Sequence, residues 1–338
     1  MRERIAWADQ AKGFEILLIF IAHFCLEELG RTTLPVQLMT LSGLTAFYFT
    51  SGYFCKGRFE LNRWLKHHFY TLLLPYFVAS FVFWVLHFVQ RHPGSFDRFL
   101  GIFLQLPNTP WEGGRWFVPS FFVAKMIFDF TASRYKERTS VLFSLCFGYA
   151  AAAWIYTLLR GPRLPWNMEA ALFAQPFFAM GYCWRHGVEQ WYENLGSRKK
   201  AVIIFVAAFF FVALAALNLK LGGRTADYHS RVLNEFFTAY GASTCALFLI
   251  LQISRINSRF LAFVGQNSLV YYMYTGLAGA VTSRITVILG WDHWAARFLI
   301  GFAGLILLLS PVAMVLNRYF PWAVGKKRPV VQTNPAEK

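Results

Sequence analysis

Charged residues are scarce in this chain of 338 residues. They make up 15% of the sequence, whereas hydrophobic residues make up 57% and aromatic residues 19%. Soluble domains contain about 25% charged residues, so this composition argues against a soluble enzyme or binding domain. The mean hydropathy of +0.41 and the repeated long apolar runs instead predict a polytopic membrane protein.

Cysteines are also few, and they are far apart in the sequence. The five are Cys25, Cys55, Cys146, Cys183 and Cys245. Cysteine metal sites and disulfide frameworks usually show short, regular spacings, which are missing here. We therefore expect no metal site and no disulfide framework, and we interpret the cysteines as small apolar packing residues.

Acidic residues are half as frequent as basic ones, with 17 Asp and Glu against 33 Lys and Arg, so the net charge is +16. A charge of this size could indicate a nucleic-acid-binding protein. However, the cations are divided among short segments between apolar runs instead of gathering in one region. Nucleic acid is therefore not an expected partner.

Apolar segments of membrane-spanning length recur along the whole chain. We expect ten helical spans, near residues 13–30, 36–55, 69–90, 116–131, 140–159, 169–185, 201–219, 235–253, 268–290 and 294–317. With the N-terminus inside, the cytoplasmic segments hold roughly twice as many Lys and Arg residues as the external loops, as the positive-inside rule requires. The prediction is an all-α membrane protein with both termini in the cytoplasm, consisting of one transmembrane domain over residues 1–325 and a short basic tail over 326–338.

The longest predicted loop, residues 91–115, is rich in proline and glycine around the apolar stretch 99–106. Irregular backbone exposed to lipid is not tolerated within the bilayer core. We therefore expect an external re-entrant or interfacial segment, which could shape the entrance for an external substrate.

The first apolar helix carries two ionisable residues at a helical spacing. Lys12 and His23 lie 11 residues apart, which is nearly three turns, so both project from one face about 16 Å apart along the axis. His23 would then lie about half a bilayer deep, where ionisable groups are costly and usually functional.

Two ion pairs are expected from helical spacing. Glu15 follows Lys12 at i+3, and Asp129 follows Lys125 at i+4, so both pairs can neutralise themselves. We prefer these pairs to a cofactor tunnel lined by Glu15 and to a proton relay through Lys125 and Asp129.

Six motifs occur in a defined order along the chain. They are Asp9, Lys12-Gly13 and His23; Phe47-Tyr48-Phe49-Thr50-Ser51-Gly52-Tyr53; the basic stretch from Arg63 that ends in Leu74-Pro75-Tyr76; Trp116-Phe117-Val118-Pro119; Phe178-Ala179-Met180-Gly181-Tyr182; and Gly265-Gln266-Asn267-Ser268-Leu269-Val270-Tyr271-Tyr272. Together they resemble membrane-bound acyltransferase family 3, which includes surface-polysaccharide O-acetyltransferases and fucose 4-O-acetylase-like proteins. Each motif alone is weak, and the ordered set over nearly the whole chain is specific.

Two positions depart from the family pattern. The histidine that often follows the late tyrosine motif is replaced by Thr275, which leaves His23 without a second catalytic imidazole. The expected Arg-x-x-Arg occurs as Arg63-x-x-Lys66. This pair keeps the charge but loses one planar fork for bidentate phosphate binding.

The resemblance implies acyl transfer from cytoplasmic acyl-CoA, most often acetyl-CoA, to a hydroxyl of a cell-envelope carbohydrate or glycolipid on the outer side of the inner membrane. Coenzyme A is polyanionic, and Lys12, Arg63 and Lys66 are expected at the inner surface to hold its phosphates. His23 is the expected general base, although a transient acyl-imidazole would use the same residue.

Further residues have expected supporting roles. Glu27 follows His23 at i+4 and could orient its ring. Ser51 or the backbone amide of Gly52 could donate to the oxyanion. Arg115 and Trp116 could contact the sugar of the acceptor.

Each assignment has a simpler structural alternative. His23 could only satisfy a neighbouring helix by hydrogen bonding, and Lys12 could be a membrane-surface anchor. Arg63 and Lys66 could be ordinary cytoplasmic loop cations, and Trp116 an interfacial anchor. A transporter or flippase would be expected to show repeats and paired broken helices, which we do not find in the sequence. Within the enzyme class, transfer of succinyl or another acyl group, or acylation of a lipid or small molecule, stays open.

Overall fold

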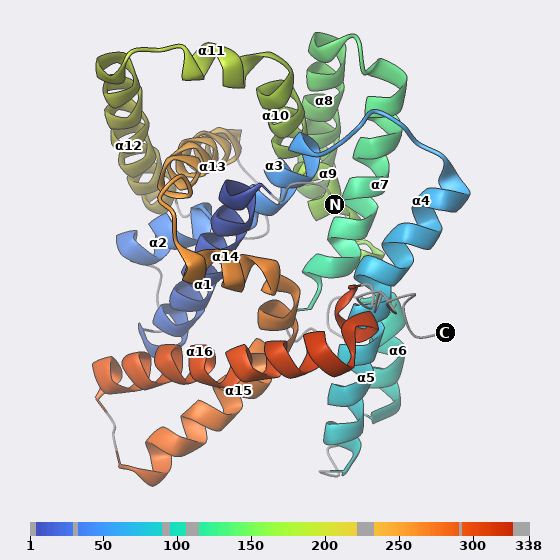
Figure 1. Cartoon of the computed structure of the whole chain (residues 1–338), viewed down its shortest axis with the longest axis vertical. Helices are drawn as coiled ribbons and strands as arrows, with labels where there is room; N and C mark the ends of the chain where they lie inside the picture. The colour runs from blue at the N-terminus through green and yellow to red at the C-terminus, as the bar shows by residue number, and fades with distance from the viewer. Residues whose placement is uncertain are drawn as a thin grey trace, which may run out of the picture.

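The structure, a computed structural model, describes residues 5–29, 33–89, 95–105, 115–221, 233–290 and 293–326. Within these residues every regular element is helical, which confirms the predicted all-α class. Figure 1 shows how the helices group: α7 to α10 lie together, α1, α2 and α14 lie centrally, and α15 and α16 cross at one end.

The elements follow one another along the chain with short connections. The first half contains α1 (Ala6–Leu29), α2 (Leu34–Leu41), α3 (Thr45–Tyr53), α4 (Leu61–His68), the π-helical turn η1 (Phe69–Leu73), α5 (Leu74–Val89), α6 (Ser95–Leu104), α7 (Phe117–Tyr135) and α8 (Thr139–Leu158). The second half contains η2 (Pro165–Asn167), α9 (Met168–Phe173), α10 (Gln175–Cys183), η3 (Trp184–Val188), α11 (Glu189–Glu193), α12 (Ser197–Lys220), α13 (Leu233–Ile253), α14 (Arg259–Gln266), α15 (Ser268–Ile288), α16 (Trp294–Tyr319) and η4 (Pro321–Val324).

Four helical segments among the described residues are long and apolar enough to cross a membrane. They are Leu61–Val89, Thr139–Leu158, Ser197–Lys220 and Arg297–Tyr319, and Phe237–Ile253 is a shorter apolar helix. A bilayer core needs about 20 apolar helical residues, so the chain is a membrane protein. The count of ten spans and the cytoplasmic location of both termini stay predictions.

Two segments that we expected to be single spans are each divided into two helices. The segment 36–55 breaks at Ser42–Leu44, where Leu44 adopts a left-handed backbone with φ of 67°. The segment 169–185 divides between α9 and α10, where Pro176 occupies the first turn of α10. Proline lacks an amide hydrogen and cannot continue the preceding helix. The predicted single helices are therefore wrong in detail at these two places.

The predicted loop 91–115 contains a helix, α6, in the part that we expected to be re-entrant or interfacial. This helix packs against α5. The hydroxyl of Tyr76 donates to the carbonyl of Ile102 at 2.7 Å, and the side-chain amide of Gln105 donates to the Tyr76 hydroxyl at 2.5 Å. The chain therefore turns out of α6 against a buried tyrosine. Residues 106–114 lie outside the described part of the chain.

Two pairs of glycines let helix backbones touch directly. A Cβ on Gly13 of α1 would collide with the carbonyl of Leu261 in α14, and a Cβ on Gly265 of α14 would collide with the carbonyl of Asp9 in α1. Between lipid-embedded helices, such small residues permit the close van der Waals packing that replaces the hydrophobic effect. The pair therefore fixes how closely α1 and α14 approach.

The second pair joins α3 to α10 in the same way. A Cβ on Gly52 would collide with the carbonyl of Phe178, and a Cβ on Gly181 would collide with the carbonyl of Phe49. All four glycines belong to the motifs that carry the family resemblance. Their role in this fold is helix packing.

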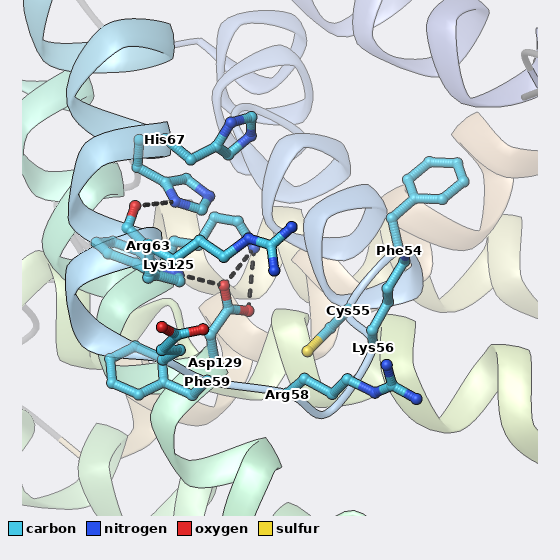
Figure 2. A pocket seen from close by; sticks show the side chains of 12 residues that line it. Phe54, Cys55, Lys56, Arg58, Phe59, Arg63, His67, Lys125 and Asp129 are labelled. Atoms are coloured by element: carbon cyan, nitrogen blue, oxygen red, sulfur yellow. Dashed lines mark hydrogen bonds and ion pairs between the residues drawn. The ribbon is translucent and has the colours of Figure 1, made fainter. Parts of the chain in front are cut away.

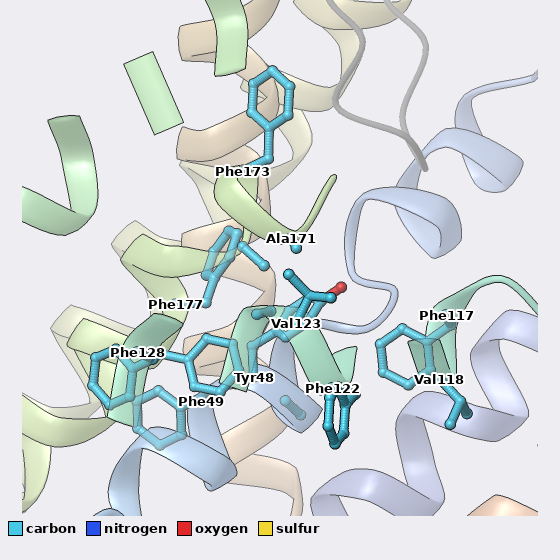
Figure 3. Close-up of a cluster of buried hydrophobic side chains, with 14 of the residues drawn as sticks. Tyr48, Phe49, Phe117, Val118, Phe122, Val123, Phe128, Ala171, Phe173 and Phe177 are labelled. Atoms are coloured by element: carbon cyan, nitrogen blue, oxygen red, sulfur yellow. The ribbon is translucent and has the colours of Figure 1, made fainter. Parts of the chain in front are cut away.

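The buried aromatic core lies around this second pair. Side chains of α3, α7, α9 and α10 meet in one cluster (Figure 3), in which Phe128 and Phe178 stack with ring centroids 5.1 Å apart. Tyr48 of α3 contacts Phe117 at 5.7 Å and Phe178 at 5.4 Å. Aromatic pairs add directional contacts to simple burial, so α3 is held rigidly against α7 and α10.

Glu15 occupies a different position from the one we expected. Its carboxylate accepts hydrogen bonds from the Thr45 hydroxyl at 3.1 Å and from the amides of Ala46 at 2.8 Å and Phe47 at 3.2 Å. The predicted ion pair between Glu15 and Lys12 is therefore wrong, and Lys12 instead pairs with Asp9 at 3.0 Å. A carboxylate suits the first amides of a helix because these amides are otherwise unsatisfied and carry partial positive charge.

We predict that Gly52→Ala lowers the stability of the protein by about 2 kcal/mol or more, because the added methyl group overpacks a backbone contact. Gly148→Ala in α8 is the matched control, since a Cβ there meets nothing within 4 Å. It should leave stability unchanged or raise it by about 0.5 kcal/mol. Thermal unfolding in detergent measures both variants, and equal melting temperatures for the two would contradict the packing role.

Candidate functional site

A wide polar pocket opens between α4, α7 and the connection from α3 to α4 (Figure 2). Its volume is about 770 Å³, and its lining residues are Phe54, Cys55, Lys56, Arg58, Phe59, Glu60, Arg63, Trp64, His67, His68, Lys125 and Asp129. We call it the donor pocket below. Its walls combine flexible cations with flat aromatic rings, a combination that suits an anionic ligand carrying an aromatic group.

Lys125 and Asp129 form an ion pair on the α7 wall of the donor pocket. The Lys125 ammonium lies 3.0 and 2.8 Å from the two carboxylate oxygens of Asp129. The two side chains are 16% and 9% exposed. This contact confirms the predicted self-neutralising pair and leaves Lys125 with little net charge to offer a ligand.

Asp129 also orients the aromatic wall of the pocket. The indole nitrogen of Trp64 donates to its carboxylate at 2.7 Å. The imidazole of His68 stacks on the Trp64 ring at 4.1 Å, and its Nδ1 lies 2.9 Å from the Trp64 carbonyl oxygen. Trp64 is buried, so its ring is held in place before any ligand binds.

The mobile cations of the donor pocket are Lys56, Arg58 and Arg63, whose side chains are all exposed. Glu60 is one opposing charge at the rim. The pocket therefore carries a positive excess, and its long cationic side chains can adjust to phosphate groups.

A second, smaller pocket lies on the other side of α4. It measures about 500 Å³ and is lined by Arg63, Lys66, His67, Tyr70, Thr71, Leu74, Trp322, Gly325 and Lys326. We call it the η4 pocket. The predicted pair Arg63 and Lys66 is thereby divided, because Arg63 borders both pockets and Lys66 borders only the η4 pocket.

Lys12 is not among the residues that line either pocket. It lies in the first half of α1, 25% exposed and paired with Asp9. The nearby Trp7 contacts Tyr53 with ring centroids 5.0 Å apart. Since Tyr53 directly precedes the first residues of the donor pocket, the start of α1 lies beside the segment that forms this pocket.

His23 lies in the second half of α1, and its side chain is exposed. Because α1 is unbroken from Ala6 to Leu29, Lys12 and His23 keep the helical spacing read from the sequence. The side chain of Glu27 lies outside the described residues. Ser51 is half-buried, in the helical turn where Gly52 packs on α10.

Arg115 and Trp116 lie at the start of α7, in a different part of the fold from the donor pocket. Arg115 is only 8% exposed, and its guanidinium lies 3.9 Å above the ring of Phe83. Burial lowers the pKa of this guanidinium from its ordinary value. The hydroxyl of Tyr272 accepts the amide of Phe117 at 3.1 Å, so α15 braces this corner of the site.

Sequence reasoning missed several residues of the donor pocket, chiefly Lys56, Arg58, Trp64 and His68. The available signal was the density of basic and aromatic residues that directly follows the second apolar segment. That signal was not specific, because any cytoplasmic loop is expected to be basic.

Comparison with known proteins identifies one family. A family model described as an acyltransferase domain matches residues 5–318. No curated protein and no solved structure matches the chain significantly.

We predict that Asp129→Asn lowers the free energy of unfolding by about 2–3 kcal/mol, because Lys125 is then left largely buried without a carboxylate. Adding Lys125→Met should restore part of this loss, and a double-mutant cycle should give a coupling energy above about 1 kcal/mol.

The exposed pair Lys136 and Glu137, 3.7 Å apart and 55% and 86% exposed, provides the control for this cycle. Lys136→Met should change stability by less than about 0.5 kcal/mol. Additive effects of the two substitutions in the donor pocket would refute the coupling.

Proposed function

The chain belongs to membrane-bound acyltransferase family 3 and is an acyltransferase, and from this premise we propose its substrates and mechanism. We propose that it transfers an acyl group, most often acetyl, from cytoplasmic acyl-CoA to a hydroxyl of a cell-envelope carbohydrate on the outer side of the inner membrane. The observation that carries this proposal is the family match over residues 5–318. The chemistry of the donor pocket supports it.

We assign the nucleotide end of acyl-CoA to the donor pocket. Lys56, Arg58 and Arg63 supply exposed cations for the phosphates, and Trp64 offers a fixed ring surface. Charge-assisted hydrogen bonds from Arg to phosphate are strong and directional. Contacts from Lys12 and Lys66 to the donor stay predictions, since neither residue lines this pocket.

The donor pocket and His23 are associated with different ends of α1. Trp7 contacts the segment that leads into the pocket, and His23 lies 16 residues further along the same helix, about 24 Å at helical rise. This separation suits a donor bound by its nucleotide at one membrane surface, with its thin thioester arm reaching into the bilayer.

His23 is the proposed general base. Its neutral imidazole accepts the proton of the acceptor hydroxyl as the hydroxyl oxygen attacks the thioester carbonyl. The carbon–sulfur bond then breaks, and the imidazolium returns the proton to the leaving thiolate. The exposed ring of His23 supports this role, because a general base must be reachable by the substrate. An oriented Glu27 carboxylate and an oxyanion contact from Ser51 are further parts of the proposal.

The acceptor side of the proposed reaction involves Arg115 and Trp116. The Arg115 guanidinium on the Phe83 ring and the neighbouring aromatic side chains provide flat surfaces and hydrogen-bond donors, which suit a sugar ring. This assignment depends on the predicted external position of the start of α7.

We predict that His23→Ala reduces acyl transfer by at least about 100-fold, the usual contribution of general acid–base catalysis, while expression and membrane insertion stay normal. Transfer of radiolabelled acetyl groups in membrane vesicles measures this. His186→Ala is the control, because His186 is exposed and lies outside both pockets. Near-normal transfer by His23→Ala would exclude the proposed mechanism.

We predict that Arg63→Ala raises the KM for acetyl-CoA by roughly 10-fold or more, as expected for one lost charge-assisted contact. The effect on kcat should be smaller, because the phosphates are bound equally in the ground and transition states. Arg134→Ala removes an exposed arginine of α7 that lines neither pocket and should leave KM unchanged. An unchanged KM in Arg63→Ala would remove Arg63 from the donor site.

The identity of the acyl group and of the acceptor can be tested together. Mass spectrometry of envelope glycans and lipids from cells with and without the gene should show one acetyl group lost from a carbohydrate. Loss of a succinyl group, or a change confined to a lipid or small molecule, would replace the proposed donor or acceptor within the same enzyme class.

A further inference from the structure

The η4 pocket changes character along its length, which the proposed acyl transfer does not explain. Its α4 wall begins with the cations Arg63 and Lys66 and continues with Tyr70 and Leu74. Lys66, Tyr70 and Leu74 follow one another at i, i+4 and i+8, so they share one helix face over about 12 Å. The pocket is therefore cationic at one end and apolar at the other.

The opposite wall, formed around η4, repeats this combination. Lys326 directs its ammonium to the side-chain oxygens of Asn267 and Asn317, both at 2.8 Å. Trp322 lies in the same wall and is 46% exposed. The two amides hold the ammonium in place while adding no negative charge of their own.

The place of the pocket in the fold points to the membrane surface. Its α4 residues lie at the beginning of Leu61–Val89, one of the segments apolar enough to cross a bilayer. Tyr70 is 55% exposed, although it is large and aromatic. Exposed Tyr and Trp residues next to Lys and Arg are typical of the level of the lipid headgroups.

We propose that the η4 pocket binds an anionic phospholipid from the surrounding leaflet. Lys66 and Lys326 contact the phosphate, and the apolar side chains of Tyr70, Leu74 and Trp322 contact the first part of an acyl chain. Basic pockets at the edges of membrane helices are suited to anionic headgroups. The Arg63-x-x-Lys66 motif is thereby divided between two ligands, with Arg63 serving the acyl donor and Lys66 the lipid.

This assignment favours a lipid over the soluble donor for a physical reason. In the donor pocket the cations Lys56, Arg58 and Arg63 are accompanied by the titratable groups Glu60 and His67. The η4 pocket instead passes from cations to an apolar surface, a pattern that matches a phosphate joined to a hydrocarbon chain.

The test uses the purified full-length protein in detergent, titrated with phosphatidylglycerol or phosphatidylcholine, with bound lipid counted by native mass spectrometry. Phosphatidylglycerol should bind in preference to phosphatidylcholine, and Lys66→Ala should weaken its binding roughly fivefold, the contribution of one lysine near an anionic lipid surface. Trp322→Ala should weaken both lipids, because it removes only apolar contact.

Lys56→Ala is the matched control, since it removes one exposed cation that lines only the donor pocket. It should leave lipid binding unchanged. A separate arm adds inorganic phosphate or coenzyme A, and neither should displace the lipid.

Three results would overturn the proposal: equal binding of the two lipids, an equal loss in Lys56→Ala, or displacement of the lipid by coenzyme A together with weaker coenzyme A binding in Lys66→Ala. The last result would return Lys66 to the donor site. None of these measurements depends on acyl transfer, so failure of the lipid proposal and failure of the proposed function are distinguishable.

Discussion

The direct contact of helix backbones at two glycine pairs is the constraint on which the rest of this structure depends. Gly13 and Gly265 join α1 to α14, and Gly52 and Gly181 join α3 to α10. Within lipid, apolar side chains gain little by moving from hydrocarbon to a helix interface, so close packing has to supply the attraction. A side chain at any of these four positions would separate the helices. Because α1 and α3 carry most of the residues assigned to the reaction, this packing also sets where the candidate site lies.

Helix α3 is held along its whole length, and this has a consequence for the donor pocket. Its first amides donate to Glu15 of α1, its middle packs on α10, and its last turn leads into Phe54 and Cys55, which line the pocket. The break before α3 exposes helix-terminal amides at a place where water is scarce, and an unsatisfied amide there would be costly. The buried carboxylate of Glu15 satisfies them. The first helix thus positions a wall of the donor pocket without lining it.

Charge is distributed in the site according to what has to stay fixed and what has to move. Lys125 and Asp129 neutralise one another and hold the Trp64 ring, so they build the wall of the pocket. Lys56, Arg58 and Arg63 are exposed on flexible side chains and can follow a polyanionic ligand as it binds and leaves. The helix α4 separates this pocket from the more amphipathic η4 pocket, so neighbouring residues of one short motif face chemically different surroundings.

The sequence by itself determined the helical class, the membrane environment, the family and the Lys125–Asp129 pair, because these depend on composition, local spacing and an ordered set of motifs. The partner of Glu15, the breaks at Leu44 and Pro176, and the separation of Lys66 from the donor pocket were decided only by the tertiary structure. Glu15 could satisfy either a cation one turn away or helix amides 30 residues later, and local spacing does not distinguish these partners. The backbone approach at Gly52 made the second choice available, because it places the start of α3 against α1 and α10 together.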